Sequence, residues 1–301
     1  MTSSDGYASG VALWSAVTAR AKVTAKATSV DSGALVRRFV FSRFLARIFH
    51  HPSSPWVLKG GTAVLARVHD ARTTKDVDLL HRLGDLDDAV EALTAATKVD
   101  LGDHFRFVIA KVERNIGGQP EVNGYRVTVD AYVGAMKKNT FGVDLVTGSL
   151  MTTAPEERTD PVLDVRGLEA PVMRLYPVVD HIADKLCAIQ ATYGTDGRLP
   201  SSRVRDLVDL VVFARSQDVD GTALIAAVHG EWKHRGLTGG PVFDPPTDWE
   251  RRYPPEARKA PIVVDFTRFE DAVVLVRAFL APVLDGTAAS RRWVAAELIW
   301  K

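Results

Sequence analysis

The residues best suited to chemistry are two aspartates, Asp76 and Asp78, in the segment Asp76-Val77-Asp78-Leu79-Leu80. The apolar neighbours predict a β-strand, and residues two apart on a strand point to the same face. Two carboxylates at this spacing can bind divalent ions, and a two-metal site supports in-line phosphoryl transfer. Magnesium is the expected ion, because the ligands are hard oxygens and no nitrogen or sulfur cluster accompanies them.

A glycine pair precedes these aspartates. Gly60, Gly61 and Thr62 follow an apolar strand expected at 56–58, and a helix is expected from Thr62 to Val68. Two glycines allow a sharp turn and leave no side chains in the way. The free N–H groups of the helix N-terminus favour an anion, and Thr62 adds a hydroxyl donor. We therefore predict that Gly60, Gly61 and Thr62 bind an anionic ligand such as a phosphate.

The Asp-x-Asp spacing alone is weak evidence, because it occurs twice more, at Asp85–Asp87 and Asp218–Asp220. Neither of these pairs follows a strand–Gly–Gly–helix unit. Both are interpreted as helix starts, where acidic side chains interact favourably with the helix dipole. A solvated edge strand is the alternative explanation of Asp76 and Asp78.

A third carboxylate, Asp144, lies in a strand expected at 141–146. Period-two alternation places Asp144 with Gly142 on the face opposite Phe141 and Val143. An acid among apolar neighbours is costly to bury unless it is paired or binds a metal. Asp144 is therefore interpreted as a metal ligand or as the base for an attacking hydroxyl. The alternative is an ordinary ion pair or a turn.

Lys185 lies beside the apolar stripe of a helix expected at 177–194. Its ammonium group either reaches solvent or crosses a cleft between domains to neutralise a triphosphate. In the next expected helix, Asp206 and Asp209 are neighbours on one face, and Arg203 is spaced to pair with Asp206. The two interpretations are a local charge network, or a role for Asp206 in orienting Lys185 or the nucleotide.

The elements that must position these residues indicate an α/β (α+β) fold with a mixed sheet followed by a mainly helical C-terminal domain. With 301 residues, 46% hydrophobic and 25% charged, the chain has the composition of a globular protein with about two domains. We expect a helical segment at 1–50, an α/β domain at 51–170 and a helical domain at 171–301. The expected helices lie at 11–30, 31–49, 62–68, 85–98, 177–194, 203–215, 220–235 and 266–284, and the expected strands at 56–58, 77–80, 105–112, 125–133 and 141–146, with a turn at Gly117-Gly118.

The overall charge identifies no partner, because 38 Lys and Arg face 37 Asp and Glu. Residues 1–50, however, carry seven basic and two acidic side chains. This excess indicates either a solvated helix face or a surface that contacts the phosphate backbone of RNA. A single cysteine, Cys187, excludes an intrachain disulfide and multi-cysteine metal sites. No targeting segment and no apolar stretch of membrane-spanning length is evident, so we expect a cytoplasmic protein and no membrane partner.

Three segments together resemble one known family. They are KGGTAVLARVHDARTTKDVDLL from Lys59, DKLCAIQATYG from Asp184 and RVRDLVDL from Arg203. In this order they resemble the AbiEii-type nucleotidyltransferase toxins of the DNA polymerase β-like superfamily, over about residues 56 to 213. The long stretch between Lys185 and Asp206 and the tail beyond residue 236 depart from the family pattern, which affects substrate choice more than chemistry.

The resemblance implies a nucleotidyltransferase fold and the transfer of a nucleoside monophosphate from an NTP. It implies that Asp76 and Asp78 hold Mg²⁺, that Lys185 and Asp206 belong to the active site, and that Arg203 and Asp209 support it. It further implies a toxin that is encoded beside an antitoxin and modifies RNA, as mycobacterial members do at the 3′ acceptor end of tRNA, blocking aminoacylation and translation. Two alternatives are transfer to a small molecule such as an aminoglycoside or to a protein hydroxyl, and a non-catalytic module that binds NTP or RNA.

Overall fold

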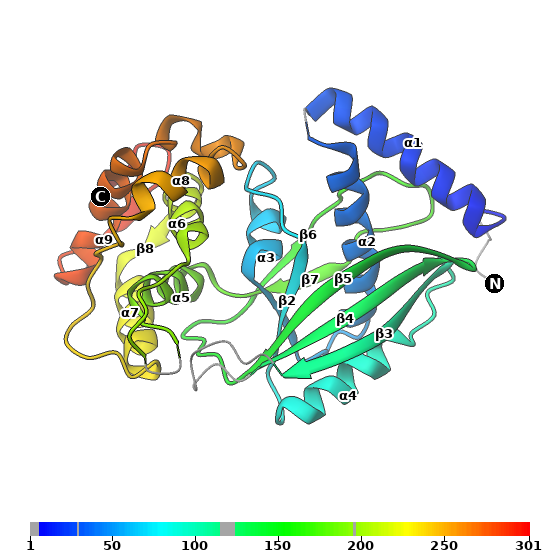
Figure 1. The fold of residues 1–301 in the computed structure, drawn as a ribbon, viewed down its shortest axis with the longest axis horizontal. Coiled ribbons are helices and arrows are strands. Elements are labelled where there is room, and N and C mark those ends of the chain that lie inside the picture. Colours follow the sequence, from blue (N-terminus) through cyan, green and yellow to red (C-terminus); the bar gives the residue numbers. More distant parts are fainter. Residues whose placement is uncertain (1–5, 29, 115–123, 195–196) are drawn as a thin grey trace.

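The computed structural model describes residues 6–28, 30–114, 124–194 and 197–301, which form a sheet half and a helical half (Figure 1). Within these residues, seven strands form one mixed sheet in the order β3-β4-β5-β2-β1-β7-β6. Strand β2 is parallel to β5 and β1 is parallel to β7, whereas the other neighbours are antiparallel. The strands are β1 (Trp56–Lys59), β2 (Asp76–His81), β3 (Phe105–Arg114), β4 (Gly124–Val133), β5 (Met136–Thr147), β6 (Glu156–Thr159) and β7 (Val172–Leu175). This arrangement confirms the predicted mixed α/β architecture.

Helices cover the apolar face of this sheet. They are α1 (Gly10–Thr28), α2 (Ser32–Ile48), α3 (Gly60–Arg67) and α4 (Leu86–Thr97). Phe44 of α2 packs edge-on against Phe107 and Phe141 of the sheet, with ring centroids 5.4 and 5.3 Å apart. The side chain of Asp85 caps α4 by accepting hydrogen bonds from two backbone N–H groups. The interpretation of Asp85–Asp87 as a helix start is therefore confirmed.

The helical half contains α5 to α9 and a small antiparallel sheet. Its elements are α5 (Val178–Gln190), α6 (Val204–Ser216), β8 (Val219–Asp220), α7 (Gly221–His234), α8 (Trp249–Ala257), a 3₁₀ helix at Pro261–Phe266, α9 (Phe269–Leu284), β9 (Arg292–Val294) and β10 (Ile299–Trp300). Asp220 caps α7, which confirms that Asp218–Asp220 is a helix start. No helix in the described part of the chain is long and apolar enough to cross a membrane.

Helix α3 joins the two halves, and it lies between them in Figure 1. Its residues Ala63 and Ala66 pack into the core of the sheet half. Val64 and Leu65 belong instead to the core that includes α5, α6 and α9. Because one short helix is shared by both cores, the turn that begins it has a fixed place relative to both halves.

The structure differs from the sequence-based expectations at strand β7 and at helix α8. Strand β7 lies beyond residue 170, where the α/β part was expected to end, yet β7 pairs with β1 and β6 in the main sheet. Residues 237–262 contain helix α8, which the prolines obscured; Trp249 and Tyr253 are fully buried and anchor it. The turn expected at Gly117-Gly118 lies outside the described residues.

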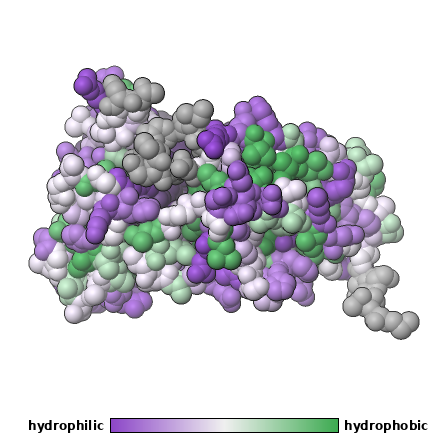
Figure 2. Space-filling model, turned by 90° about the horizontal axis from the view of Figure 1, so that it is seen from below, coloured by the Kyte–Doolittle hydropathy of each residue, from purple (hydrophilic) through white to green (hydrophobic). Residues whose placement is uncertain are grey.

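On the face seen in Figure 2, hydrophobic residues lie among hydrophilic ones.

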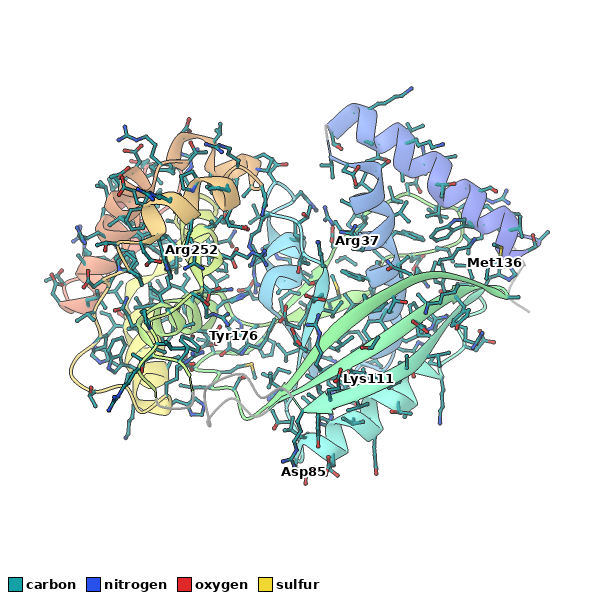
Figure 3. All side chains as sticks on the ribbon, in the orientation of Figure 1. Arg37, Asp85, Lys111, Met136, Tyr176 and Arg252 are labelled. Atoms are coloured by element: carbon teal, nitrogen blue, oxygen red, sulfur yellow. The ribbon has the colours of Figure 1, made fainter. Side chains whose placement is uncertain are left out.

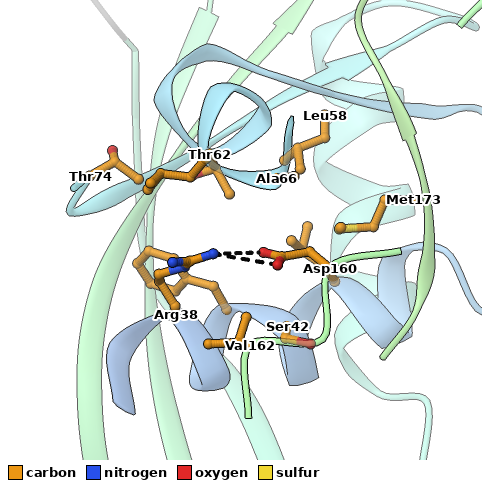
Figure 4. Close-up of a pocket in the computed structure, with 12 residues that line it drawn as sticks. Arg38, Ser42, Leu58, Thr62, Ala66, Thr74, Asp160, Val162 and Met173 are labelled. Carbon is orange, nitrogen blue, oxygen red and sulfur yellow. Dashed lines mark hydrogen bonds and ion pairs between the residues drawn. The ribbon is translucent and has the colours of Figure 1, made fainter. Parts of the chain in front are cut away.

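Much of the positive charge at the N-terminus is internal. Arg43 and Arg47 of α2 are buried and both pair with the buried carboxylate of Asp103, at 2.8 and 2.6 Å. Arg38 pairs with Asp160 at 3.1 Å inside a small, mostly apolar cavity between α2 and α3 (Figure 4). The expectation that these three arginines contribute to a phosphate-contacting or solvated surface is therefore wrong, because carboxylates distant in sequence neutralise them.

Replacing Arg47 by alanine should lower the free energy of unfolding by about 3–5 kcal/mol, because it leaves the buried Asp103 carboxylate with Arg43 as its one cationic partner. Arg20→Ala is the control, since Arg20 pairs with the exposed Asp164 and its loss should cost at most about 1 kcal/mol. Urea denaturation measures both values. Equal costs for the two variants would contradict a structural role for the buried pair.

Candidate active site

Three aspartates share the face of the sheet opposite the helices α1, α2 and α4. Strand β2 runs parallel to β5, with Asp78 in register with Asp144 and Asp76 in register with Gly142. The intervening Val77 is fully buried in the core on the other face. Strand alternation therefore places Asp76, Asp78 and Asp144 side by side, as the sequence predicted.

Gly60 brings the turn into direct contact with Asp78. Antiparallel pairing of β1 and β2 sets Lys59 opposite Asp78, and Gly60 follows with a φ of 57°. A Cβ atom at this position would lie 1.9 Å from Oδ2 of Asp78. Both the left-handed backbone and the close approach require glycine here. The carboxylate consequently packs against the first residue of α3.

The N-terminus of α3 keeps backbone donors available. The residue before the helix, Lys59, makes no side-chain cap, so the helix N–H groups are not satisfied in that way. Gly61 lies beside Thr74 and the guanidinium of Arg72. The Thr62 hydroxyl donates to the carbonyl of Asp76 at 2.8 Å, so Thr62 ties α3 to β2. Phosphate binding by Gly60, Gly61 and Thr62 stays a prediction.

Lys185 of α5 is buried, with only 5% of its side chain exposed. Its Nζ lies 2.6 Å from Oδ1 of Asp206 and 2.9 Å from Oδ2 of Asp209, both on α6. Burial lowers the pKa of Lys185, but the two carboxylates outweigh burial and hold it above its usual range. Arg203 also pairs with Asp206, as predicted. The alternative that Lys185 reaches solvent is wrong, and the local charge network offered for Asp206 is present. A role of Asp206 in orienting Lys185 for a nucleotide stays a prediction.

Arg72 completes this charge cluster from the sheet half. Its guanidinium forms two hydrogen bonds of 2.9 Å with the carboxylate of Asp209. Together with Lys185, Arg203 and Asp206, these residues comprise three cations and two anions. The cluster therefore has one net positive charge beside Gly61, and it connects the loop before β2 to α6.

Asp78 is the carboxylate most affected by its surroundings. Its pKa is raised to about 6, first by burial and then by the charges of Asp144 and Asp76, while Lys185 and Lys59 act in the opposite direction. Lys59 is itself mostly buried, with Nζ 2.9 Å from Oγ of Ser149. Both Lys185 of α5 and Lys59, which precedes Gly60, interact electrostatically with Asp78. We therefore treat both lysines as parts of the same candidate site.

Three cations of this site were not identified from the sequence: Lys59, Arg72 and Arg126. Lys59 directly precedes the glycine pair and Arg72 lies four residues before Asp76, so position relative to the motif was an available signal. No such sequence signal points to Arg126, which lies on β4, far along the chain from the motif. It contacts Asp76 and Asp144 only because three strands lie in this register.

The carboxylate oxygens of Asp76 and Asp78 have the donor chemistry that Mg²⁺ prefers. Nevertheless, among the described residues no group of three or more Asp, Glu, His or Cys side chains is arranged to hold a metal ion. Arg126 engages one oxygen of Asp76 and one of Asp144. Metal binding by Asp76 and Asp78 therefore stays a prediction that the residue types fit.

Asp78→Asn should stabilise the protein in EDTA at about pH 8 by about 1–3 kcal/mol, because Asp78 with a pKa near 6 must there hold a charge that its surroundings disfavour. A raised pKa destabilises the fold above that pKa and has no effect below the unfolded value. The advantage of asparagine should therefore disappear below about pH 4. Urea denaturation across this range tests the sign, and a pH-independent difference would contradict it.

Comparison with known proteins identifies the family. The family described as "Nucleotidyl transferase AbiEii toxin, Type IV TA system" matches residues 43–296. No curated protein matches this chain. The solved structure of MenT4, a nucleotidyltransferase toxin from Mycobacterium tuberculosis H37Rv, is 16% identical, with a TM-score of 0.51, and covers 87% of this chain and 98% of its own. JHP933 from Helicobacter pylori is also 16% identical, with a TM-score of 0.41, covering 86% of this chain and 94% of its own.

The likeness to MenT4 concerns the fold, in which a mixed sheet is followed by a largely helical C-terminal part. The family match spans the Asp76–Asp78 strand, the Lys185 helix and the Asp206–Asp209 helix. The chain belongs to the AbiEii family, the nucleotidyltransferase toxins of type IV toxin–antitoxin systems.

Proposed function

We propose that this toxin uses Mg²⁺ to transfer a nucleoside monophosphate from its NTP co-substrate to RNA, at the 3′ acceptor end of tRNA. The observation that carries the proposal is the carboxylate face of Asp76, Asp78 and Asp144 directly beside the uncapped N-terminus of α3. Modification of the acceptor end would block aminoacylation, and a cognate antitoxin would prevent this arrest of translation.

In this proposal Asp76 and Asp78 hold the metal, which when bound neutralises phosphate charge and favours the in-line geometry of phosphoryl transfer. The backbone N–H groups of Gly60 and Gly61 bind the triphosphate. Lys185 supplies positive charge to the triphosphate, and Asp206 fixes its position through the 2.6 Å ion pair. Lys59 and Arg72 add further positive charge on either side of the turn.

The transfer step needs a base as well as binding groups. The oxygen of the acceptor hydroxyl forms a bond to the α-phosphorus of the NTP, the bond to the bridging oxygen breaks, and pyrophosphate leaves. The hydroxyl proton passes to a carboxylate on this face. We assign this role to Asp144, which lies in register with Asp78 and is 28% exposed at its side chain.

A basic groove supports RNA as the acceptor. It is lined by Lys22 of α1, Arg37 of α2 and Lys138 of β5, together with small and polar residues. Within the described part of the chain, no carboxylate lies within ion-pair distance of these three cations. Figure 3 locates Arg37 on α2 and Met136 at the start of β5, the elements that bound the groove. Unpaired cations in a groove suit a phosphate backbone.

Asp78→Ala should reduce transfer of labelled NMP to total tRNA by about 10³-fold or more, because it removes a metal ligand worth several kcal/mol of transition-state stabilisation. Circular dichroism should show an intact fold. The matched control is Asp87→Ala, since Asp87 is the second aspartate of another Asp-x-Asp tripeptide and is exposed on α4. Transfer by Asp78→Ala at the unmodified rate would overturn the assignment of the active site.

Parallel incubations of the unmodified protein with each NTP and with RNA, total protein or an aminoglycoside should identify the acceptor. Label on RNA 3′ ends alone supports the proposal. Label on protein or on the aminoglycoside would contradict RNA as the acceptor and would identify that class of molecule as the acceptor instead. Nucleotide binding without pyrophosphate release would instead indicate a non-catalytic module.

Charge reversal of the groove, by Lys22→Glu, Arg37→Glu and Lys138→Glu together, should weaken tRNA binding and reduce its salt dependence by about two to three counterions. The rate at saturating tRNA should change little, because the groove residues are separate from the carboxylate face. An equal charge change at the exposed Arg251, Arg258 and Arg277 of the helical half is the control. Fluorescence anisotropy at several salt concentrations measures binding, and equal effects of both triple variants would contradict a specific role for the groove.

A further inference from the structure

Arg126 forms a bridge across the carboxylate face. It lies on β4, in register with Asp144 of β5. Its Nη2 is 2.5 Å from Oδ1 of Asp76, and its Nη1 is 2.6 Å from Oδ2 of Asp144. The guanidinium therefore extends from β4 over the whole width of β5 to reach β2.

Gly142 makes this bridge possible. It lies on β5 two residues before Asp144, paired with Asp76 of β2 on one side and with Thr128 of β4 on the other. A Cβ atom at position 142 would lie 2.3 Å from both Cζ and Nη2 of Arg126. Any side chain at this position would displace the guanidinium, so the bridge requires glycine at position 142.

The bridge solves an electrostatic problem. Three carboxylates on one face repel one another, and each is costly to desolvate without a cation. Arg126 places a positive charge between two of them and satisfies an oxygen of each by charge-assisted hydrogen bonds. A divalent ion held by Asp76 and Asp78 would likewise supply positive charge to this face.

We propose that Arg126 is a built-in counter-ion that competes with the metal, so that Asp76 becomes a metal ligand only after the guanidinium leaves Asp76 and Asp144. The proposal rests on the metal-binding role proposed above for Asp76 and Asp78. It also explains why the carboxylates are not arranged as a metal site while Arg126 bridges them.

The side chain of Arg126 can leave without disrupting the core, because 37% of it is exposed. Water or the phosphate oxygens of an arriving metal–nucleotide complex can take its hydrogen bonds. As long as the bridge is in place, only the open fraction of molecules is competent, and the apparent metal affinity falls by that fraction. A bridge that is formed in nine molecules of ten would weaken metal binding about tenfold.

The test uses Mn²⁺ as the probe, with the full chain and without nucleotide. Isothermal titration calorimetry should show about tenfold tighter Mn²⁺ binding for both Arg126→Ala and Gly142→Ala than for the unmodified protein. Gly142→Ala is informative because it displaces the guanidinium but removes no charge. The control is Arg106→Ala, which removes a guanidinium that lies over the Tyr132 ring, 4.3 Å from its centroid, and it should leave Mn²⁺ affinity unchanged.

Thermal unfolding gives a second readout. In EDTA, Arg126→Ala should unfold at a lower temperature than the unmodified protein, and saturating Mn²⁺ should raise its unfolding temperature by more. Unchanged or weaker Mn²⁺ binding by both folded variants, with normal binding by the unmodified protein, would overturn the competition and leave the metal site standing. Failure of all the proteins to bind Mn²⁺, with or without NTP, would instead overturn the metal role of Asp76 and Asp78 and the competition with it.

Discussion

The structure depends on how the repulsion among three carboxylates on one face of the sheet is compensated. Asp76, Asp78 and Asp144 lie on neighbouring strands with their side chains on the same face, so their mutual repulsion is fixed by strand register. The raised pKa of Asp78 reports this repulsion together with burial. Two cations reduce the unfavourable free energy of this repulsion. They are Arg126 from the sheet and Lys185 from the helical half.

The same charges hold the two halves of the protein in relation to each other. Helix α3 is shared by both hydrophobic cores, and its first residue contacts Asp78. Next to this turn, Arg72 of the sheet half binds Asp209 of α6, which also binds Lys185 of α5. In the proposed function the turn that would bind the triphosphate is positioned by packing and Lys185 by two carboxylates, so these groups would be preorganised for the nucleotide.

Local patterns predicted much of this. The strand–Gly–Gly–helix unit, the Asp76–Asp78 strand, the Asp144 strand and the α5 and α6 helices all follow from short-range periodicity, and register then brought the three aspartates together. Features that depend on distant partners were not predictable in this way. The burial of Arg43 and Arg47 required Asp103, and helix α8 formed despite two prolines because Trp249 and Tyr253 are buried. The bridge from Arg126 depends on a three-strand register and on the absence of a side chain at Gly142.

The central claim is that the carboxylates of β2 and the N-terminus of α3 together hold a metal-bound nucleotide. The most direct measurement is a crystal structure of the protein with Mn²⁺ and a non-hydrolysable NTP, with manganese located by its anomalous scattering. The account predicts manganese bound to carboxylate oxygens of Asp76 and Asp78, and phosphate oxygens on the backbone N–H groups of Gly60 and Gly61. Manganese and triphosphate bound elsewhere on the protein, with neither aspartate coordinated, would contradict it.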